Sequence, residues 1–324
     1  MSKCLPAQLG FAIFCAVVLT YPNAQAQNAI KVLKPLPQPL VQAVLVEKNV
    51  RVKEYFEYLD QLVQSQDTSS EFILTEHLLV RHNPWLIERL ANTDYYRQMA
   101  AGQFVHDQKQ LVVLKAGDTL HLPTAEQAWA LLEHMRQTRL DVNIPEYKLR
   151  ILQDQDTLYG FPVRVGQRTD KYLETAGKEV DLRTQTGKGK IVAVNKNADW
   201  VNPVDGHHYT ATRRDDGKVT ACPRIPWLEP ELNGERLGQL IHPTTNPSTL
   251  GKVYSNGCIG LSEADAWYVY YYAPVGTPLQ VRYELEIPGP DGEKVVLPDI
   301  YGKNEGRIGS FKVLRGLQAE AWEK

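Results

Sequence analysis

A histidine and a cysteine in the second half of the chain could together perform acyl-transfer chemistry. His242 follows a short apolar run, and Cys258 comes sixteen positions later, at the end of the run 254–258. A thiol is a good nucleophile only as the thiolate, so a catalytic cysteine needs a base or a positive charge nearby. His242, at the end of a predicted strand, is a candidate for that base. The pair predicts a cysteine nucleophile with a histidine partner.

The residues just before this cysteine predict a tight turn. Ser255 and Gly257 are small and let the backbone bend, so that successive N–H groups can point at one place. Such N–H groups can stabilise the oxyanion of a tetrahedral intermediate. An isolated Cys and His are more often structural, so types and spacing alone leave both interpretations open.

The composition excludes several classes of protein. The 324 residues are 43% hydrophobic and 23% charged, which is typical of globular chains and excludes a fibrous or wholly disordered one. At about 150 residues per domain, the length suits two domains. The 36 basic residues nearly balance the 38 acidic ones, so charge gives no indication of nucleic-acid binding.

The N-terminus has the features of an export signal. Lys3 precedes the apolar run 10–20, and Ala24-Gln25-Ala26 is a small-x-small cleavage site. A membrane-spanning helix needs about 20 apolar residues, more than this run supplies, although a buried N-terminal helix is an alternative. We therefore expect a signal peptide over residues 1–26 and, after its cleavage, an extracytoplasmic protein with no stable membrane insertion.

Cleavage would leave two of the four cysteines, Cys222 and Cys258. An exported protein can join such a pair in a disulfide or keep one thiol free for chemistry. The neighbours of Cys222 offer no base, so we interpret it as structural and expect no bond to Cys258. His207 and His208 lack further ligands at metal-binding spacing, so we expect a loop there and no metal site.

The first half of the chain predicts a Pro-rich linker over residues 27–49 and a largely helical domain over 50–140. Apolar residues at helical spacing predict a helix over 50–64, and a second helical stretch over 75–90 is interrupted at Asn83-Pro84. Residues 110–122 predict short strands. A further helix over 124–139 begins with Thr124 as N-cap and Gln127 at the capping-box position.

From residue 141 the pattern changes to short strands separated by turns. One helix, residues 262–272 with Ser262 as N-cap, interrupts these strands, which we predict at 142–145, 147–152, 160–166, 191–194, 239–241 and 279–283. The fold class is therefore α+β, with a mostly β domain over 141–285 and a C-terminal tail over 286–324.

In this domain the motifs resemble the L,D-transpeptidase family, the YkuD-type catalytic domain. That family has a histidine at a strand end, a gap of similar length, Ser-His-Gly-Cys or Ser-Ser-Gly-Cys, a helix, and a Gly-Thr-Pro strand. This chain has His242, Ser255-Asn256-Gly257-Cys258, the helix 262–272 and Gly276-Thr277-Pro278. Residues 142–149 and 163–166 are similar to the family's opening strands, so the resemblance covers residues 141–285.

The resemblance implies roles for individual residues. Cys258 would be the nucleophile and His242 the base, with the Pro243 carbonyl holding the imidazole in the useful tautomer. The N–H groups of Gly257 and Cys258 would form the oxyanion hole. Three neighbours would support the site: Thr244, Ser255 and Asn256. The implied fold is a β-sandwich with a flanking helix.

Three positions depart from the family pattern. Pro243 stands where the family usually has glycine, and Asn256 removes a possible second imidazole. Gly260 stands where the family commonly has an arginine, two residues after the nucleophile. Three nearby arginines are candidates to replace that cation: Arg213, Arg214 and Arg224.

The resemblance implies an exported L,D-transpeptidase that acts on peptidoglycan stem peptides in the bacterial cell envelope, needs no cofactor or metal, and is a monomer. A carboxypeptidase or endopeptidase on the same scaffold is the first alternative, and a non-catalytic peptidoglycan-binding protein is the second. Residues 83–86 and 113–123 also resemble the second half of a LysM glycan-binding module. The alternative for this region is an accessory helical domain.

Overall fold

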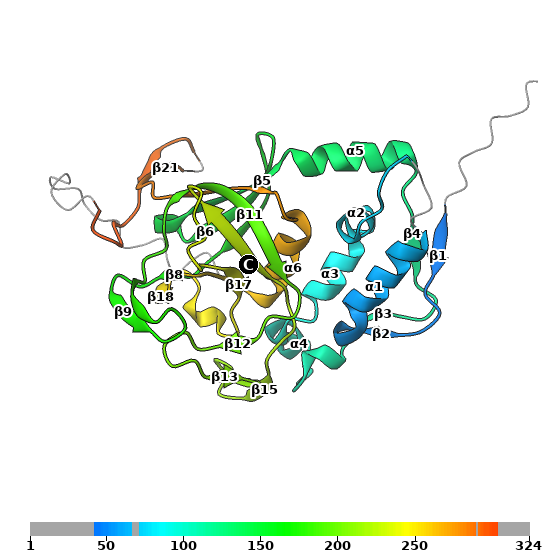
Figure 1. Cartoon of the computed structure of the whole chain (residues 1–324), viewed down its shortest axis with the longest axis horizontal. Helices are drawn as coiled ribbons and strands as arrows, with labels where there is room; N and C mark the ends of the chain where they lie inside the picture. Colours follow the sequence, from blue (N-terminus) through cyan, green and yellow to red (C-terminus); the bar gives the residue numbers. More distant parts are fainter. Residues whose placement is uncertain (1–41, 67–70, 290, 304–324) are drawn as a thin grey trace, which may run out of the picture. The chain divides into compact units, whose positions relative to one another are not determined.

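A computed structural model describes residues 42–66, 71–289 and 291–303. These residues belong to one compact unit that begins at Val41. The expected α+β class is confirmed: a helical N-terminal region precedes a β-rich region with one flanking helix (Figure 1). The expected signal peptide, residues 1–26, lies outside the described residues. No helix within the described ranges is both long and apolar enough to cross a membrane.

The described part of the N-terminal region contains five α-helices, and the sequence predicted four of them. Their bounds are α1 Val52–Gln66, α2 Glu76–His82, α3 Trp85–Ala91, α4 Tyr95–Ala100 and α5 Ala125–Arg136. In α1 the buried side chains recur every three or four residues, as the apolar spacing predicts. Helix α4 has only six residues and no apolar stripe, so periodicity gives no signal for it.

Polar side chains set the helix ends. Thr75 caps α2 by accepting a hydrogen bond from the Leu78 N–H, and the capping box of Thr124 and Gln127 at the start of α5 is present. The predicted interruption at residues 83–84 separates α2 from α3. Asn83 ends α2, and its side chain donates to the Leu79 carbonyl.

Two small antiparallel strand pairs accompany these helices. Strand β1 (Ala43–Leu45) pairs with β4 (Thr119–His121), and β2 (Val50–Arg51) pairs with β3 (Val112–Leu114). Strand β1 lies inside the predicted linker, so its residues 43–45 belong to the folded unit instead. The part of that linker before residue 42 lies outside the described residues.

An eight-stranded sheet forms the centre of the β-rich region. Its strands, in spatial order, are β19 Ile259–Leu261, β17 Ile241–Pro243, β16 Trp227–Leu232, β11 Gly187–Asn195, β20 Pro278–Arg282, β5 Thr138–Asn143, β6 Lys148–Gln153 and β7 Asp156–Pro162. The chain leaving β7 reaches the opposite edge, where Arg164 and Gly260 exchange two backbone hydrogen bonds of 2.9 and 3.0 Å. The sheet thus nearly closes into a barrel, where the resemblance implied a sandwich.

The remaining strands form small pairs around this sheet. They are β8 Val165–Gly166 with β18 Val253–Ser255, β9 Asp170–Leu173 with β10 Lys178–Asp181, β12 Trp200–Val201 with β13 His208–Tyr209, β14 Ala211–Arg213 with β15 Val219–Ala221, and β21 Glu286–Pro288 with β22 Lys294–Val296. His208 therefore lies in a strand, whereas we expected a loop. The described part of the C-terminal tail wraps back onto the domain, because Tyr301 is buried and donates to the Gly166 carbonyl.

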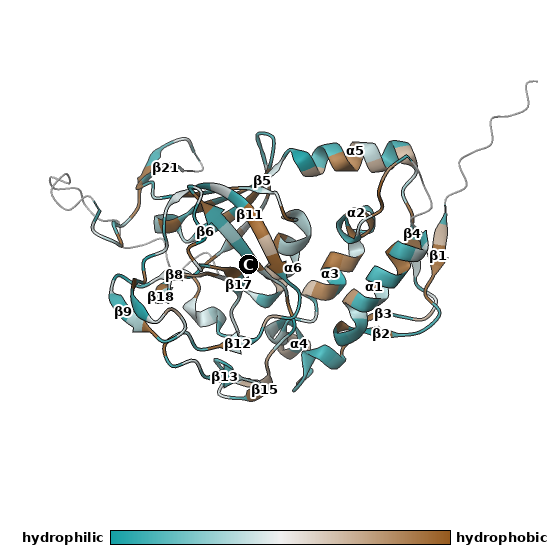
Figure 2. Ribbon diagram, viewed as in Figure 1, coloured by the Kyte–Doolittle hydropathy of each residue, from teal (hydrophilic) through white to brown (hydrophobic). Residues whose placement is uncertain are grey.

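Helix α6 (Glu263–Tyr272) joins the two regions. Ser262 caps it, as predicted, and its buried face includes Trp267, Tyr270 and Tyr271. The helix packs against α2 and α3 on one side and β17 on the other. Figure 2 shows α1 with a hydrophilic and a hydrophobic side, and the buried residues of α1 share one hydrophobic cluster with α6 and the sheet. The helical region is therefore part of the same core as the sheet.

Candidate active site

Two parallel strands bring His242 and Cys258 into register. Strands β17 and β19 pair so that Ile241 lies opposite Ile259 and His242 opposite Gly260. Cys258 immediately precedes β19. Since side chains two residues apart share a face of a strand, Cys258 lies on the same face as position 260. The predicted nucleophile and base thus occupy neighbouring strands at one edge of the sheet.

The cysteine sulfur is held by the backbone of the segment entering β17. The Leu240 N–H donates to the Cys258 Sγ at 3.3 Å, and the Ile259 N–H donates to the Leu240 carbonyl at 2.9 Å. An N–H donor at this distance favours the thiolate over the thiol. Nothing in the residue pattern indicates this role for Leu240, because the role depends on strand pairing.

The turn before Cys258 requires glycine. Gly257 has φ of +107°, in the region that other residues avoid, and a Cβ there would lie 2.7 Å from the Gln239 Nε2. The Ser255 hydroxyl donates to the Cys258 carbonyl at 2.5 Å, and the Thr184 hydroxyl donates to the Gly257 carbonyl at 2.9 Å. These bonds fix the turn from both sides.

The turn also leaves two donors unused. Within the described part of the chain, neither the Gly257 N–H nor the Cys258 N–H donates a hydrogen bond to a backbone or side-chain acceptor. Both donors adjoin the sulfur in the chain. They are therefore available to an oxyanion, in the place that the resemblance implied.

The His242 ring is oriented by its neighbours. Its Nδ1 lies 2.8 Å from the Pro243 carbonyl oxygen, and its ring lies 4.6 Å, centroid to centroid, from the Trp227 indole. A carbonyl can only accept, so this contact places the proton on Nδ1 and leaves Nε2 as an acceptor. The contact expected between Pro243 and the imidazole is thus present.

Burial keeps both members of the pair neutral. It lowers the pKa of His242 to about 3, with a further lowering from the Arg164 charge and a smaller opposing effect of the Pro243 carbonyl. Burial also raises the pKa of Cys258, opposed by the Leu240 N–H and by Arg164. At neutral pH the site therefore holds an uncharged imidazole and a thiol.

Arg164 is a site residue that sequence reasoning missed. It lies between β7 and β8 and pairs with Gly260 across the strand edge. Its charge acts on both Cys258 and His242. The strand signal at residues 163–166 was visible, but nothing in the sequence indicates which strand lies beside the cysteine.

The three arginines predicted to replace the missing cation are engaged elsewhere. Arg214 is buried and paired with Glu263, Arg224 donates to the Lys53 carbonyl at 2.6 Å, and Arg213 is exposed on β14. Arg214 was a candidate to replace the missing cation. Its ion pair makes it structural instead.

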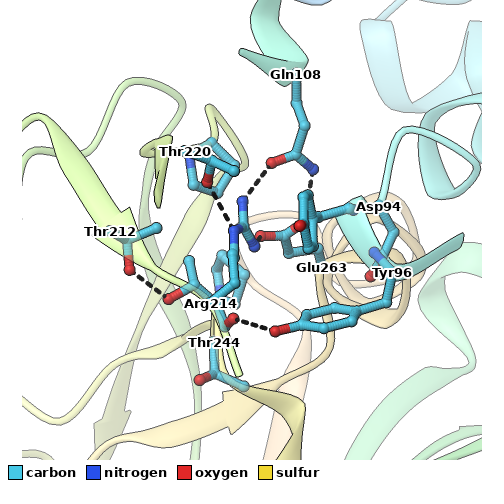
Figure 3. A network of polar contacts seen from close by, with 12 residues as sticks. Asp94, Tyr96, Gln108, Thr212, Arg214, Thr220, Thr244 and Glu263 are labelled. Carbon is cyan, nitrogen blue, oxygen red and sulfur yellow. Dashed lines mark hydrogen bonds and ion pairs between the residues drawn. The ribbon is translucent and has the colours of Figure 1, made fainter. Parts of the chain in front are cut away.

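The Arg214 side chain organises a buried polar network (Figure 3). Its guanidinium donates to Glu263, to the Gln108 side chain at 2.7 Å and to the Thr220 hydroxyl at 2.7 Å. Gln108 belongs to the helical region, Glu263 begins α6, and Thr220 lies in β15. The network therefore ties the helical region to the β14–β15 hairpin.

The same network reaches the segment that follows His242. The Tyr96 hydroxyl of α4 donates to the Thr245 carbonyl at 3.2 Å, and the Thr212 and Thr245 hydroxyls lie 2.9 Å apart. Thr244 is buried, and its N–H donates to the Leu261 carbonyl at 2.7 Å. The residues just after the histidine are thus held by both regions.

Replacing Arg214 with Met should destabilise the protein by about 3–5 kcal/mol, because Glu263 would keep a buried, uncompensated charge. The matched control is Arg213→Met, an exposed neighbour that should change the free energy of unfolding by less than about 0.5 kcal/mol. Urea unfolding monitored by tryptophan fluorescence measures both. An Arg214→Met variant as stable as the control would show that the pair does not hold the two regions together.

Cys222 follows β15, and no hydrogen bond among the described residues joins it to Cys258 or His242. It is free and buried, and burial raises the pKa of its thiol to about 11. It lines a cavity of about 230 Å³ together with Trp200, Tyr209, Ala211, Thr212 and Arg213. Both described cysteines are free thiols in this structure.

The other predicted residues have less defined positions. Asn256 is half-buried, and its side chain makes no hydrogen bond to any described residue, so no contact assigns it a role. His207 lies in the turn before β13. Among the described residues, no three His, Cys, Asp or Glu side chains are grouped to hold a metal ion.

Comparison with known proteins identifies the β-rich region. The profile of the L,D-transpeptidase catalytic domain, YkuD, matches residues 137–281, which leaves the region predicted to resemble LysM unmatched. No curated protein matches the chain.

Solved structures also match. An L,D-transpeptidase from Mycobacterium smegmatis is 17% identical with a TM-score of 0.30, and the match covers 45% of this chain and 58% of that one. The chain thus spans less than two thirds of that protein. An L,D-transpeptidase fragment from Xylanimonas cellulosilytica is 14% identical with a TM-score of 0.33, covering 77% of this chain and all of that one. The catalytic domain of the E. faecium L,D-transpeptidase is 17% identical with a TM-score of 0.30, and the match covers 46% of this chain and 99% of that one.

Proposed function

We propose that this chain, whose residues 137–281 are an L,D-transpeptidase catalytic domain of the YkuD family, cross-links peptidoglycan through a thioester on Cys258. The observation that carries the proposal is the register of β17 and β19, which sets His242 one strand away from the cysteine. The sulfur lies between an N–H donor and a glycine turn with two free N–H groups. This is the arrangement that acyl transfer to a thiol needs.

In the first step the Cys258 sulfur attacks the carbonyl between the third and fourth residues of a tetrapeptide stem. The His242 Nε2 takes the thiol proton as the C–S bond forms and gives it to the departing amine as the C–N bond breaks. The terminal D-amino acid leaves, and the tripeptide acyl group stays on sulfur. The Gly257 and Cys258 N–H groups stabilise the intermediate oxyanion.

In the second step an amine from a neighbouring stem attacks the thioester. The new C–N bond forms and the C–S bond breaks, while His242 moves the amine proton to the leaving sulfur. The enzyme returns to its starting state, and two stems are joined. Neither step requires a metal or an organic cofactor.

The neighbouring residues support these steps but do not themselves accept or donate the transferred proton. Pro243 fixes the imidazole tautomer, since its carbonyl accepts from Nδ1. Ser255 holds the turn by donating to the Cys258 carbonyl. Thr244 anchors the end of β17 against β19, and Asn256 is assigned to the turn only by its position before Gly257.

A peptidoglycan substrate places the working enzyme outside the cytoplasm. The proposed signal peptide at residues 1–26 would deliver it there, and a periplasmic or other cell-envelope location follows. Residues 50–140, as the helical accessory domain, would keep the catalytic domain rigid through the core that they share.

Product analysis tests the function. Purified protein is incubated with tetrapeptide muropeptides, and the products are separated and identified by their masses in mass spectrometry. The Cys258→Ala variant is the negative control. Cross-linked dimers, with release of the terminal D-amino acid, are expected. Tripeptide monomers alone would mean that water resolves the thioester and that the protein is a carboxypeptidase. Binding of muropeptides without any product would identify a wall-binding protein and overturn the proposal.

A further inference from the structure

The Arg164 side chain occupies the space that a side chain at position 260 would fill. A Cβ placed on Gly260 would lie 2.6 Å from the Arg164 Nε and 2.7 Å from its Cγ. Both distances are far shorter than van der Waals contact, so residue 260 can be only glycine while Arg164 keeps this position. Position 260 shares a strand face with Cys258. The guanidinium therefore lies on the nucleophile's side of β19.

The hydrogen-bonding capacity of Arg164 is largely unused. Its Nη1 donates to the Thr249 hydroxyl at 3.3 Å, while its Nε is buried and has no acceptor. Throughout residues 42–66, 71–289 and 291–303, no carboxylate lies within 4.0 Å of it. An arginine has five N–H donors in a fork that matches a carboxylate.

Two other half-buried or buried arginines of the same region have a carboxylate partner, whereas the half-buried Arg224 donates to the Lys53 carbonyl. Arg214 pairs with Glu263, and Arg282 donates to both oxygens of Asp141 at 2.7 and 2.9 Å. A cation that is largely withdrawn from water without a counter-ion is costly to fold. Such a cation beside a nucleophile indicates an anion that arrives with the substrate.

The substrate of the proposed reaction supplies that anion. The carboxylate of the terminal D-residue is separated from the scissile carbonyl only by the nitrogen and the α-carbon of that residue. When the carbonyl lies at the Cys258 sulfur, this carboxylate lies within a few ångströms of it. The free donors of Arg164 are on the same side of β19.

We propose that Arg164 binds the terminal carboxylate of the acyl donor and thereby takes, from a different strand, the place of the arginine that similar sequences carry at position 260. The proposal rests on the proposed function, because it names the group that recognises the donor. It also explains why this chain has glycine at 260. Side chains at positions 164 and 260 compete for the same space, so an arginine can supply the positive charge from one of these positions or the other.

Single-turnover acylation of Cys258, followed by intact-protein mass, tests this role. Two donors are compared: a tetrapeptide with a free terminal carboxylate and the same peptide as its terminal amide. The wild type should react about 10- to 100-fold faster with the free carboxylate, the scale of a hydrogen-bonded charge pair. The Arg164→Gln variant should lose this preference, because its acylation by the donor with the free carboxylate should become slower. Arg236→Gln, which removes an exposed arginine paired with Glu229, should keep it.

Moving the arginine from position 164 to position 260 provides a second test. Gly260→Arg alone must displace Arg164 and should be impaired, whereas Arg164→Ala combined with Gly260→Arg should regain much of the preference for the carboxylate. Thermal unfolding of each variant separates loss of fold from loss of recognition. The pH dependence of Cys258 alkylation by iodoacetamide is a readout without any donor, and Arg164→Gln should shift its midpoint upwards.

The outcomes separate the two proposals. If both donors acylate the wild type and Arg164→Gln keeps the same preference, Arg164 does not bind the carboxylate, and the proposed function stands. Equal rates for the two donors on the wild type would also overturn the role of Arg164. If neither donor acylates the wild type, the proposed function fails, and the donor-site role fails with it.

Discussion

Cys258→Ala should abolish turnover of tetrapeptide muropeptides, while Cys222→Ser leaves it largely intact. Of the two described cysteines, only Cys258 has a sulfur that accepts a backbone N–H and lies one strand away from a histidine. Without a nucleophile there is no thioester, and the loss should reach the detection limit. The rate of D-amino acid release measures both variants.

Cys222→Ser is the matched control for this substitution, because it removes the other described thiol, which is buried. Circular dichroism should give the same spectrum for both variants. Comparable loss of activity in the two would mean that Cys222 takes part in the chemistry, and the assignment of the nucleophile would be wrong.

His242→Gln should lower the acylation rate at least about 100-fold, the lower end of what a general base contributes. Glutamine can keep a contact to the Pro243 carbonyl through its amide N–H, but it cannot accept the thiol proton. Asn256→Ser should cost much less, because its side chain makes no hydrogen bond within the described residues. Rapid-quench acylation with an excess of donor measures both rates. An Asn256 variant as inactive as the His242 variant would overturn this division of roles.

The pH dependence of acylation gives a second check on His242. Burial and the Arg164 charge lower its pKa to about 3, whereas an ordinary histidine titrates near 6.5. The imidazole is therefore already the neutral base at pH 5, and the acylation rate should show no loss centred near pH 6.5 on acidification. The raised pKa of Cys258 places the transition to thiolate on the alkaline side instead. A decrease in the acylation rate on acidification, with a midpoint near pH 6.5, would show that His242 is solvated and titrates like an ordinary histidine.

Local sequence signals predicted the parts of the fold that depend on local interactions. The cap at Thr124, the break at Asn83-Pro84 and the helix beginning after Ser262 each depend on residues within four positions. The Cys-His pair was also predicted, because the motif around it resembles that of the L,D-transpeptidase family. The contact of His242 with the Pro243 carbonyl followed from adjacency in the chain.

Features that depend on distant pairing were not predictable. Arg164 lies 94 positions before Cys258 and reaches the site only because the sheet nearly closes. The buried ion pair of Arg214 was not predicted, since its partners Gln108 and Glu263 come from other regions of the chain. The β12–β15 strands are two or three residues long, too short for an alternating pattern.

The covalent state of Cys258 tests the central claim most directly. Wild-type protein is mixed with a tetrapeptide donor in the absence of an amine acceptor, and the reaction is quenched in acid. The mass of the intact protein is measured by mass spectrometry, and the modified peptide is then identified after proteolytic digestion. We expect a mass increase equal to the mass of the donor minus the mass of the released D-amino acid, located on the peptide that contains Cys258. Product formation with no adduct on wild-type protein, or an adduct on Cys222 instead, would contradict it.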